Sequence, residues 1–189
     1  MRRTLVLVMM ITWVFSLAIL RCEGAGLARA AESACEKFGI IGFPDKKPAA
    51  PFTLDALDGK QVSLASFKGK SVMLFMWVSW CESCRDELPL IENFAQQNKD
   101  QLAVLLVAID GERREKLEAI INKSKVTLPV LLMKGKYGDK LMDQYRVRGY
   151  IPQTFLVDSN GLLIGKIIGP RHWDSVEAMS CMKDLFGLR

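Results

Sequence analysis

The feature that most constrains this chain is a pair of cysteines, Cys81 and Cys84, between a continuous apolar run and a helix-compatible run. The apolar run, residues 72–78, is typical of a central strand that is covered on both faces of its sheet. The following run, residues 85–99, has apolar side chains at helical spacing, and Pro89 inside it should kink the helix. Cys81 is therefore expected at the end of a buried strand and at the start of a helix.

A thiol at a helix N-terminus has a stabilised thiolate form. The backbone N–H groups of the first turn lack partners there, and the positive end of the helix dipole faces Cys81. Cys84 lies one turn further on and can close a disulfide with it. A structural zinc site would need four ligands, and Cys35, Cys181 and His172 include no second close pair. We therefore expect thiol–disulfide chemistry that needs neither a metal nor a cofactor.

Residues 1–30 have the pattern of a targeting segment. Arg2 and Arg3 precede an uncharged stretch, residues 4–20, and residues 28–30 offer a small-x-small cleavage site. The stretch is long for a signal peptide and barely long enough to span a bilayer, so residues 1–30 form either a signal peptide or an N-terminal membrane anchor. In both cases we expect a periplasmic or otherwise extracytoplasmic domain, soluble after cleavage or anchored to the inner membrane, where disulfides are permitted.

The charge distribution argues against nucleic acid as a partner. The formal net charge is +5, of which residues 1–31 contribute +3 and residues 32–189 contribute +2. The exported part is therefore close to neutral, with basic and acidic residues interspersed, so nucleic acid is not an implied partner.

The exported part holds an even number of cysteines, because Cys22 belongs to the leader. If Cys81 pairs with Cys84, then Cys35 and Cys181 remain near the two ends of the domain. A structural bridge between them would close a very long loop and stabilise the fold by about 4–5 kcal/mol through lost chain entropy. The alternative is two buried free thiols, and both remain open because connectivity cannot be read from spacing.

The other segments alternate between strand and helix patterns. Residues 31–49 are expected to be an irregular arm before a domain that spans residues 50–189. Asp58-Gly59 and Ser159-Asn160-Gly161 predict two hairpins. The other expected elements are strands over residues 102–109 and 130–133 and helices over residues 113–123, 139–145 and 175–186. This order predicts an α/β fold with a mixed central sheet flanked by helices.

This order, with Trp80, Cys81 and Cys84 after the first long buried strand, resembles the thioredoxin fold. Residues 75–89 are similar to the active-site signature of the TlpA/ResA/CcmG-like thiol–disulfide oxidoreductases of the redoxin/AhpC-TSA superfamily. The matching positions are Trp77, Trp80, Cys81, Cys84, Glu87 and Pro89. Residues 145–158 resemble the cis-proline segment of the group, and an N-terminal β-hairpin and a strand–helix insertion over residues 102–123 are also typical of it. The resemblance covers about residues 50–186.

The resemblance implies catalytic roles for three residues. Cys81 would attack a substrate disulfide as a thiolate, and Cys84 would resolve the mixed disulfide. Glu87 would be a buried carboxylate, with a pKa raised toward neutrality, that handles protons for the cysteines. The alternative for Glu87 is a solvated helix carboxylate, as expected for Asp86.

The resemblance also implies a substrate-binding edge. Pro152 is the candidate cis-proline, and a cis bond would bring the Ile151 backbone beside Cys81, where it could pair with an extended substrate segment. Trp80 is expected to contact the substrate, whereas Trp77 is expected in the core. The alternative for Pro152 is an ordinary loop proline.

The expected activity is protein-disulfide reduction. Glu82 beside Cys81 disfavours the thiolate, which favours a reductant over an oxidant, although a solvated charge would have little effect. The resemblance implies protein disulfide substrates, with apocytochrome c during cytochrome c maturation as the leading one, and a membrane electron donor of the DsbD/CcdA type. The alternatives are a Sco-like copper metallochaperone, for which the C-x-x-C spacing and His172 fit poorly, and a thiol-dependent peroxidase, which expects a Thr that residues 78–81 lack.

Overall fold

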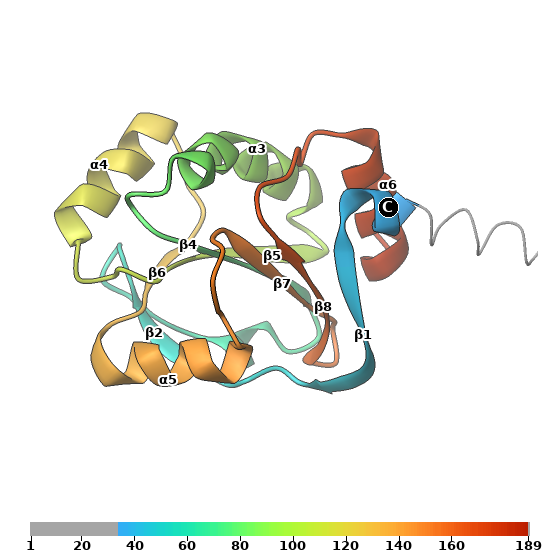
Figure 1. The fold of residues 1–189 in the computed structure, drawn as a ribbon, viewed down its shortest axis with the longest axis horizontal. Helices are drawn as coiled ribbons and strands as arrows, with labels where there is room; N and C mark the ends of the chain where they lie inside the picture. Colours follow the sequence, from blue (N-terminus) through green and yellow to red (C-terminus); the bar gives the residue numbers. More distant parts are fainter. Residues whose placement is uncertain (1–33, 189) are drawn as a thin grey trace, which may run out of the picture.

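The computed structural model describes residues 34–188 (Figure 1). The strands are β1 (Ile40–Pro48), β2 (Thr53–Ala56), β3 (Gln61–Ser63), β4 (Ser71–Trp77), β5 (Leu102–Ala108), β6 (Val130–Leu132), β7 (Gln153–Val157) and β8 (Leu162–Ile168). The helices are the 3₁₀ turn η1 (Leu64–Phe67), α3 (Glu82–Asn98), α4 (Arg114–Ser124), α5 (Gly135–Tyr145) and α6 (Val176–Phe186). The strands form one mixed sheet in the order β1-β8-β7-β4-β5-β6-β2-β3. The predicted α/β fold with a mixed central sheet is confirmed.

Strand β4 lies at the centre of the sheet, and all seven of its residues are buried. It pairs in parallel with β5 and antiparallel with β7. Because successive side chains point to opposite faces, Met73, Phe75 and Trp77 enter the core under α3, α4 and α6, while Leu74 and Met76 enter the core over α5. Figure 1 shows this division, with α5 alone below the sheet. The apolar run of the sequence is continuous because both faces of this strand are covered.

Both predicted hairpins form. Strands β2 and β3 pair antiparallel across the turn that contains Gly59, and β7 and β8 pair across the turn that contains Gly161. Each glycine has a positive φ, +84° and +80° respectively, which a residue with a Cβ rarely adopts. The turn chemistry therefore placed these hairpins correctly.

The expectation of an irregular arm is wrong for residues 40–48. These residues form β1, which pairs antiparallel with β8 and so occupies the edge of the sheet. The ladder is interrupted between Gly42 and Lys47, and this interruption accommodates Pro44, which has no N–H to donate. Most β1 side chains are exposed, and the strand has no apolar alternation to reveal it. Backbone pairing with β8, rather than burial of its side chains, holds this strand in the sheet.

Helix α5 begins four residues earlier than expected, at Gly135 rather than Asp139. The N-cap position, Lys134, makes no side-chain capping bond. Instead, the Gly135 N–H donates to Glu112 Oε1 at 2.8 Å, so a carboxylate from a distant loop supplies the missing partner. A local reading of the sequence misses a cap of this kind.

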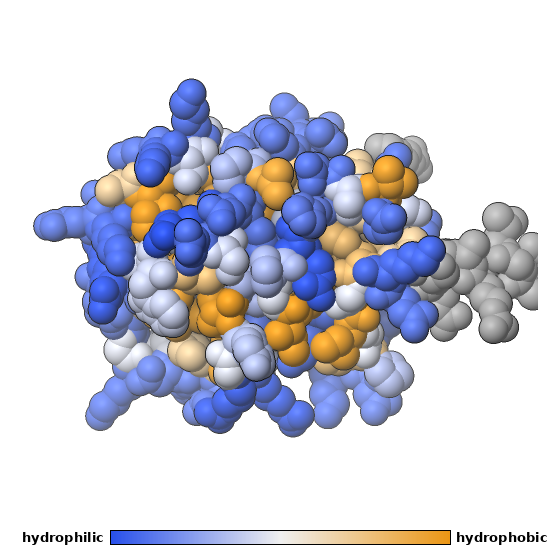
Figure 2. Space-filling view, turned by 45° about the horizontal axis from the view of Figure 1, so that its top comes forward, coloured by the Kyte–Doolittle hydropathy of each residue, from blue (hydrophilic) through white to orange (hydrophobic). Residues whose placement is uncertain are grey.

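The expected leader, residues 1–30, lies outside the described residues and stays a prediction. Across residues 34–188, no helix has the length and apolar character that a membrane span requires. On the face shown in Figure 2, hydrophilic residues cover much of the surface and apolar residues form small separate groups.

Candidate active site

The two cysteines lie where β4 leads into α3. Cys81 is the N-cap residue of α3, and its Sγ atom is bonded to that of Cys84 at 2.14 Å. The Cys84 N–H donates to Cys81 Sγ at 3.2 Å. Cys84 is fully buried, whereas Cys81 keeps 9% of its surface exposed, so Cys81 is the sulfur within reach of a partner. In the reduced protein, the same N–H and the helix dipole are placed to stabilise a Cys81 thiolate.

The turn between β4 and Cys81 is held by a side-chain clamp from two other elements. Ser79 is fully buried, and both its N–H and its hydroxyl donate to the Asp110 carboxylate, at 3.0 and 2.7 Å. The Ser79 carbonyl accepts from Arg85 Nη1 at 3.1 Å. Asp110 follows β5 and Arg85 belongs to α3, so this clamp fixes the backbone that carries Cys81 to its two neighbouring elements.

The Ile151–Pro152 peptide bond is cis, and it places the Ile151 carbonyl oxygen 3.9 Å from Cys81 Sγ. Pro152 is buried and Ile151 is half-buried. The buried Gln153 side chain donates to the carbonyl of Tyr150 at 2.9 Å, which holds the loop before the proline. The structure thus brings the expected substrate edge beside the first cysteine.

Two exposed aromatic side chains adjoin residues of the site in the sequence, one next to Cys81 and one next to Ile151. Trp80, directly before Cys81, is 63% exposed, and Tyr150, directly before Ile151, is 80% exposed. Trp77, in contrast, is fully buried in the core. Large aromatic rings left in water beside a reactive group are suited to contacting a partner.

Glu87 lies one turn after Cys84 on the same face of α3 and is only 3% exposed. Its Oε1 accepts from the Arg171 N–H and from Trp173 Nε1, each at 2.9 Å. Its Oε2 has no hydrogen-bond partner among the described residues. Burial raises the pKa of Glu87 from 4.5 to about 7, while the two N–H donors and the positive charge of Arg171 oppose the rise. A carboxyl that titrates near neutral pH can both accept and return a proton.

The other two cysteines of residues 34–188 are joined to each other. Cys35, in a helical turn over residues 34–38, forms a disulfide with Cys181 of α6 across a sequence separation of 146. The bridge ties the chain before β1 to the last helix. His172 is exposed. Across residues 34–188, no three His, Cys, Asp or Glu side chains gather closely enough to hold a metal ion.

Several residues of the site were not expected from the sequence: Ser79, Arg85, Asp110, Tyr150, Gln153, Arg171 and Trp173. For Asp110 a signal exists, because it follows a strand parallel to β4 and the carboxyl ends of parallel neighbours meet at one edge of a sheet. For Arg171 and Trp173 no local signal exists, because they lie 84 and 86 residues from Glu87.

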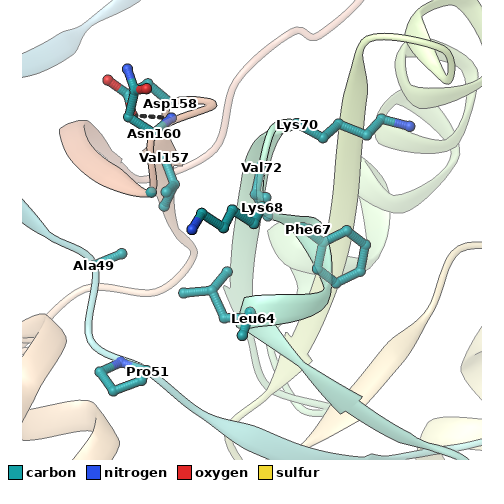
Figure 3. Close-up of a pocket in the computed structure, with 12 residues that line it drawn as sticks. Ala49, Pro51, Leu64, Phe67, Lys68, Lys70, Val72, Val157, Asp158 and Asn160 are labelled. Carbon is teal, nitrogen blue, oxygen red and sulfur yellow. Dashed lines mark hydrogen bonds between the residues drawn. The ribbon is translucent and has the colours of Figure 1, made fainter.

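Two cavities of the described part lie away from the disulfide. One, of about 220 Å³, is at the opposite end of β4, lined by Val72, Leu64, Phe67 and Val157, and Figure 3 shows the Lys68 side chain reaching into it. Another, of about 430 Å³, lies between β1 and the end of α5. Neither is lined by a residue of the cysteine site.

Known proteins resemble this chain in sequence and in fold. Residues 46–165 match the AhpC/TSA family. The chain is 34% identical over 126 residues to the thioredoxin-like protein YneN of Bacillus subtilis. This aligned stretch covers 65% of this chain and 71% of that protein. It is 31% identical over 132 residues to the thiol-disulfide oxidoreductase ResA of Bacillus cereus, over 69% of this chain and 73% of that protein. The solved thioredoxin domain of a thiol-disulfide oxidoreductase from Bacteroides vulgatus aligns with a TM-score of 0.65 at 26% identity, covering 74% of this chain and 96% of that chain. The chain therefore belongs to the AhpC/TSA family and is a thiol–disulfide oxidoreductase with a thioredoxin-like fold.

Proposed function

We propose that the protein reduces disulfide bonds of other proteins outside the cytoplasm, with Cys81 as the nucleophile and Cys84 as the resolving thiol. One observation carries this proposal: Cys81 Sγ accepts the Cys84 N–H at the start of α3 and lies 3.9 Å from the Ile151 carbonyl. The first contact favours a thiolate, and the second supports a role for the Ile151 backbone edge in binding a substrate beside Cys81. An extended substrate segment can pair with such an edge.

The reaction passes two electrons to the substrate. The Cys81 thiolate attacks one sulfur of the substrate disulfide, forms a mixed disulfide and releases the other substrate sulfur as a thiolate. Cys84 then loses its proton to Glu87 and attacks Cys81 Sγ. The Cys81–Cys84 disulfide forms, the second substrate sulfur leaves, and the released thiolates are protonated, one by the proton held on Glu87 and the other by water.

The direction of transfer follows from charges near Cys81. Glu82 is exposed in the first turn of α3, where a negative charge opposes a thiolate at the neighbouring position. A less stable thiolate favours the disulfide form and therefore makes the dithiol a stronger reductant. The pair must then be returned to the dithiol form by an external donor.

The partners follow from the resemblance to the TlpA/ResA/CcmG group. As electron donor we propose a membrane protein of the DsbD/CcdA type, and as substrate apocytochrome c before haem attachment. The relative from Bacillus cereus is named a thiol-disulfide oxidoreductase, which supports the reaction class. The leader pattern of residues 1–30 supports export, and a leader that remains uncleaved would keep the domain at the membrane.

The test uses the reduced protein and a protein disulfide such as that of insulin. Wild type is expected to reduce it stoichiometrically, and Cys81→Ser is expected to be inactive. Cys84→Ser is expected to stop at the mixed disulfide, because no second thiol can release the substrate. In cells, the same variant should retain its substrates covalently, and mass spectrometry would show whether apocytochrome c is among them.

The proposal fails if Cys84→Ser traps no mixed disulfide or if Cys81→Ser keeps the activity of wild type. A measured reduction potential near that of a DsbA-type oxidant, about −120 mV, would contradict the reducing direction. Retention of other proteins but never of apocytochrome c would overturn the proposed substrate alone.

A further inference from the structure

We propose that Trp173 is a positioning residue of the active site: its indole N–H holds Glu87 Oε1, so that Oε2 is the oxygen that takes and returns the proton. This inference rests on the proposed function, because it specifies how the proton of Cys84 is handled during resolution.

The hydrogen bonds at Glu87 distinguish its two oxygens. Oε1 accepts two N–H groups, from Arg171 and Trp173, each at 2.9 Å. Oε2 is buried and has no partner among the described residues. A carboxylate oxygen has two lone pairs in the plane of the carboxyl group, and both lone pairs of Oε1 already accept N–H groups. A proton bound by Glu87 therefore belongs on Oε2.

The direction of the indole N–H is fixed by packing. Trp173 is 1% exposed and lies in the segment between β8 and α6. Its ring meets the edge of Phe38 with centroids 5.2 Å apart, and it lies 5.5 Å from the ring of Phe94 on α3. A ring held between two aromatic neighbours cannot turn its N–H away without opening the core. The bond to Glu87 is thus imposed by the fold.

The arrangement determines what happens to the proton of Cys84. Cys84 and Glu87 are buried on one face of α3, three positions apart. When the Cys84 thiol ionises, its proton passes to Oε2, and the Cys84 thiolate attacks Cys81 Sγ. The substrate thiolate that leaves is protonated from Oε2. Trp173 and Arg171 stabilise the charged carboxylate between these two transfers, and so keep it an acid of near-neutral strength despite its burial.

The core supplies a matched control. Trp77 is also fully buried in the same core, but its Nε1 has no hydrogen-bond partner among the described residues. Trp77→Phe and Trp173→Phe therefore remove the same indole N–H group, and only Trp173→Phe removes a bond to Glu87. A general effect of replacing a buried indole would appear in both variants.

The first experiment follows the pH dependence of the resolving step in Trp173→Phe and Trp77→Phe. Loss of a donor to the carboxylate makes Glu87 harder to ionise, so the midpoint assigned to Glu87 should move up by about one pH unit in Trp173→Phe, a tenfold change in proton affinity. In Trp77→Phe the midpoint should stay at the wild-type value. An unmoved midpoint in folded Trp173→Phe, or an equal shift in both variants, would overturn the proposal.

The second experiment needs no variant of Trp173 and uses the oxidised protein. The Nε1–H resonance of Trp173 should titrate with a midpoint near 7, because its acceptor changes charge there, and that of Trp77 should not. Replacement of Glu87 by Gln should abolish the titration. A Trp173 resonance that is flat with pH would refute the proposal even if Trp173→Phe does not fold. If wild type fails to reduce insulin while the Trp173 resonance titrates, the proposed function fails and the hydrogen-bond assignment stands.

Discussion

Replacement of Glu87 by Gln should remove a pH-dependent loss of stability. The carboxyl is 3% exposed, and burial raises its pKa to about 7, whereas the ordinary value of 4.5 applies in the unfolded chain. Between these two values, the unfolded chain has released a proton that the folded protein still holds. The free energy of unfolding of wild type therefore falls as the pH rises through this window.

The magnitude follows from the difference between the two pKa values. Each pKa unit corresponds to about 1.4 kcal/mol, so a shift from 4.5 to about 7 costs wild type about 3 kcal/mol once the pH exceeds 7. Below pH 4.5 the loss is absent, because both states are protonated. Gln cannot ionise, and its amide oxygen can accept the N–H groups of Arg171 and Trp173. Relative to wild type, Glu87→Gln should therefore gain about 3 kcal/mol between pH 4 and pH 8.

The measurement is denaturant unfolding of the oxidised proteins at several pH values from 4 to 8. The informative quantity is the difference in unfolding free energy between Glu87→Gln and wild type, because the other titrating groups cancel in it. Asp86→Asn is the matched control, since it removes one negative charge from the exposed side of the same helix. Its difference from wild type should stay nearly constant over this range.

A difference for Glu87→Gln that is equal at pH 4 and pH 8 would refute the reasoning. It would mean that the carboxyl titrates in the folded protein as it does in the unfolded chain, and that burial in this core does not penalise its charge. A difference that shrinks with rising pH would also contradict it, because the carboxylate would then be stabilised by the fold.

Two further predictions concern residues outside the dithiol. The double variant Cys35→Ser, Cys181→Ser should lower the unfolding free energy of the oxidised protein by up to about 5 kcal/mol, since it opens a loop with a sequence separation of 146; unchanged denaturation would exclude a stabilising bridge. Asp110→Ala should lower the unfolding free energy by about 1–3 kcal/mol, because it leaves the buried Ser79 N–H and hydroxyl without their acceptor. Ser79→Ala should lower the unfolding free energy by less, and a larger loss in Ser79→Ala than in Asp110→Ala would contradict the clamp.

The centre of the fold and the reactive pair are predictable from local chemistry. The continuous apolar run over residues 72–78 predicts a strand covered on both faces of the sheet, and β4 spans nearly the same residues, Ser71–Trp77. The turn residues around Gly59 and Gly161 specify hairpins through backbone conformations that other residues avoid. The spacing of Cys81 and Cys84 at a strand-to-helix junction indicated thiol chemistry. All of these signals are local, because each lies within one or two turns of chain.

The edge of the sheet was not predictable in this way. Strand β1 joins β8 through backbone hydrogen bonds, and its side chains remain largely exposed. The start of α5 depends on Glu112, a residue of another loop, rather than on its own N-cap. Neither contact leaves a periodic pattern in the sequence, because backbone pairing and distant caps make few demands on neighbouring side chains.

Glu87 illustrates which properties of a residue follow from the local sequence and which follow from the tertiary structure. Its place one turn after Cys84 follows from the chain itself, because residues three apart share a face of a helix. Its acid strength and the identity of its proton-carrying oxygen depend on Arg171 and Trp173, more than eighty residues away. Local sequence specifies which groups can react, since periodicity and turn chemistry act over short stretches. Tertiary packing decides their protonation, since burial and hydrogen-bond donors come from whichever segments the fold brings together.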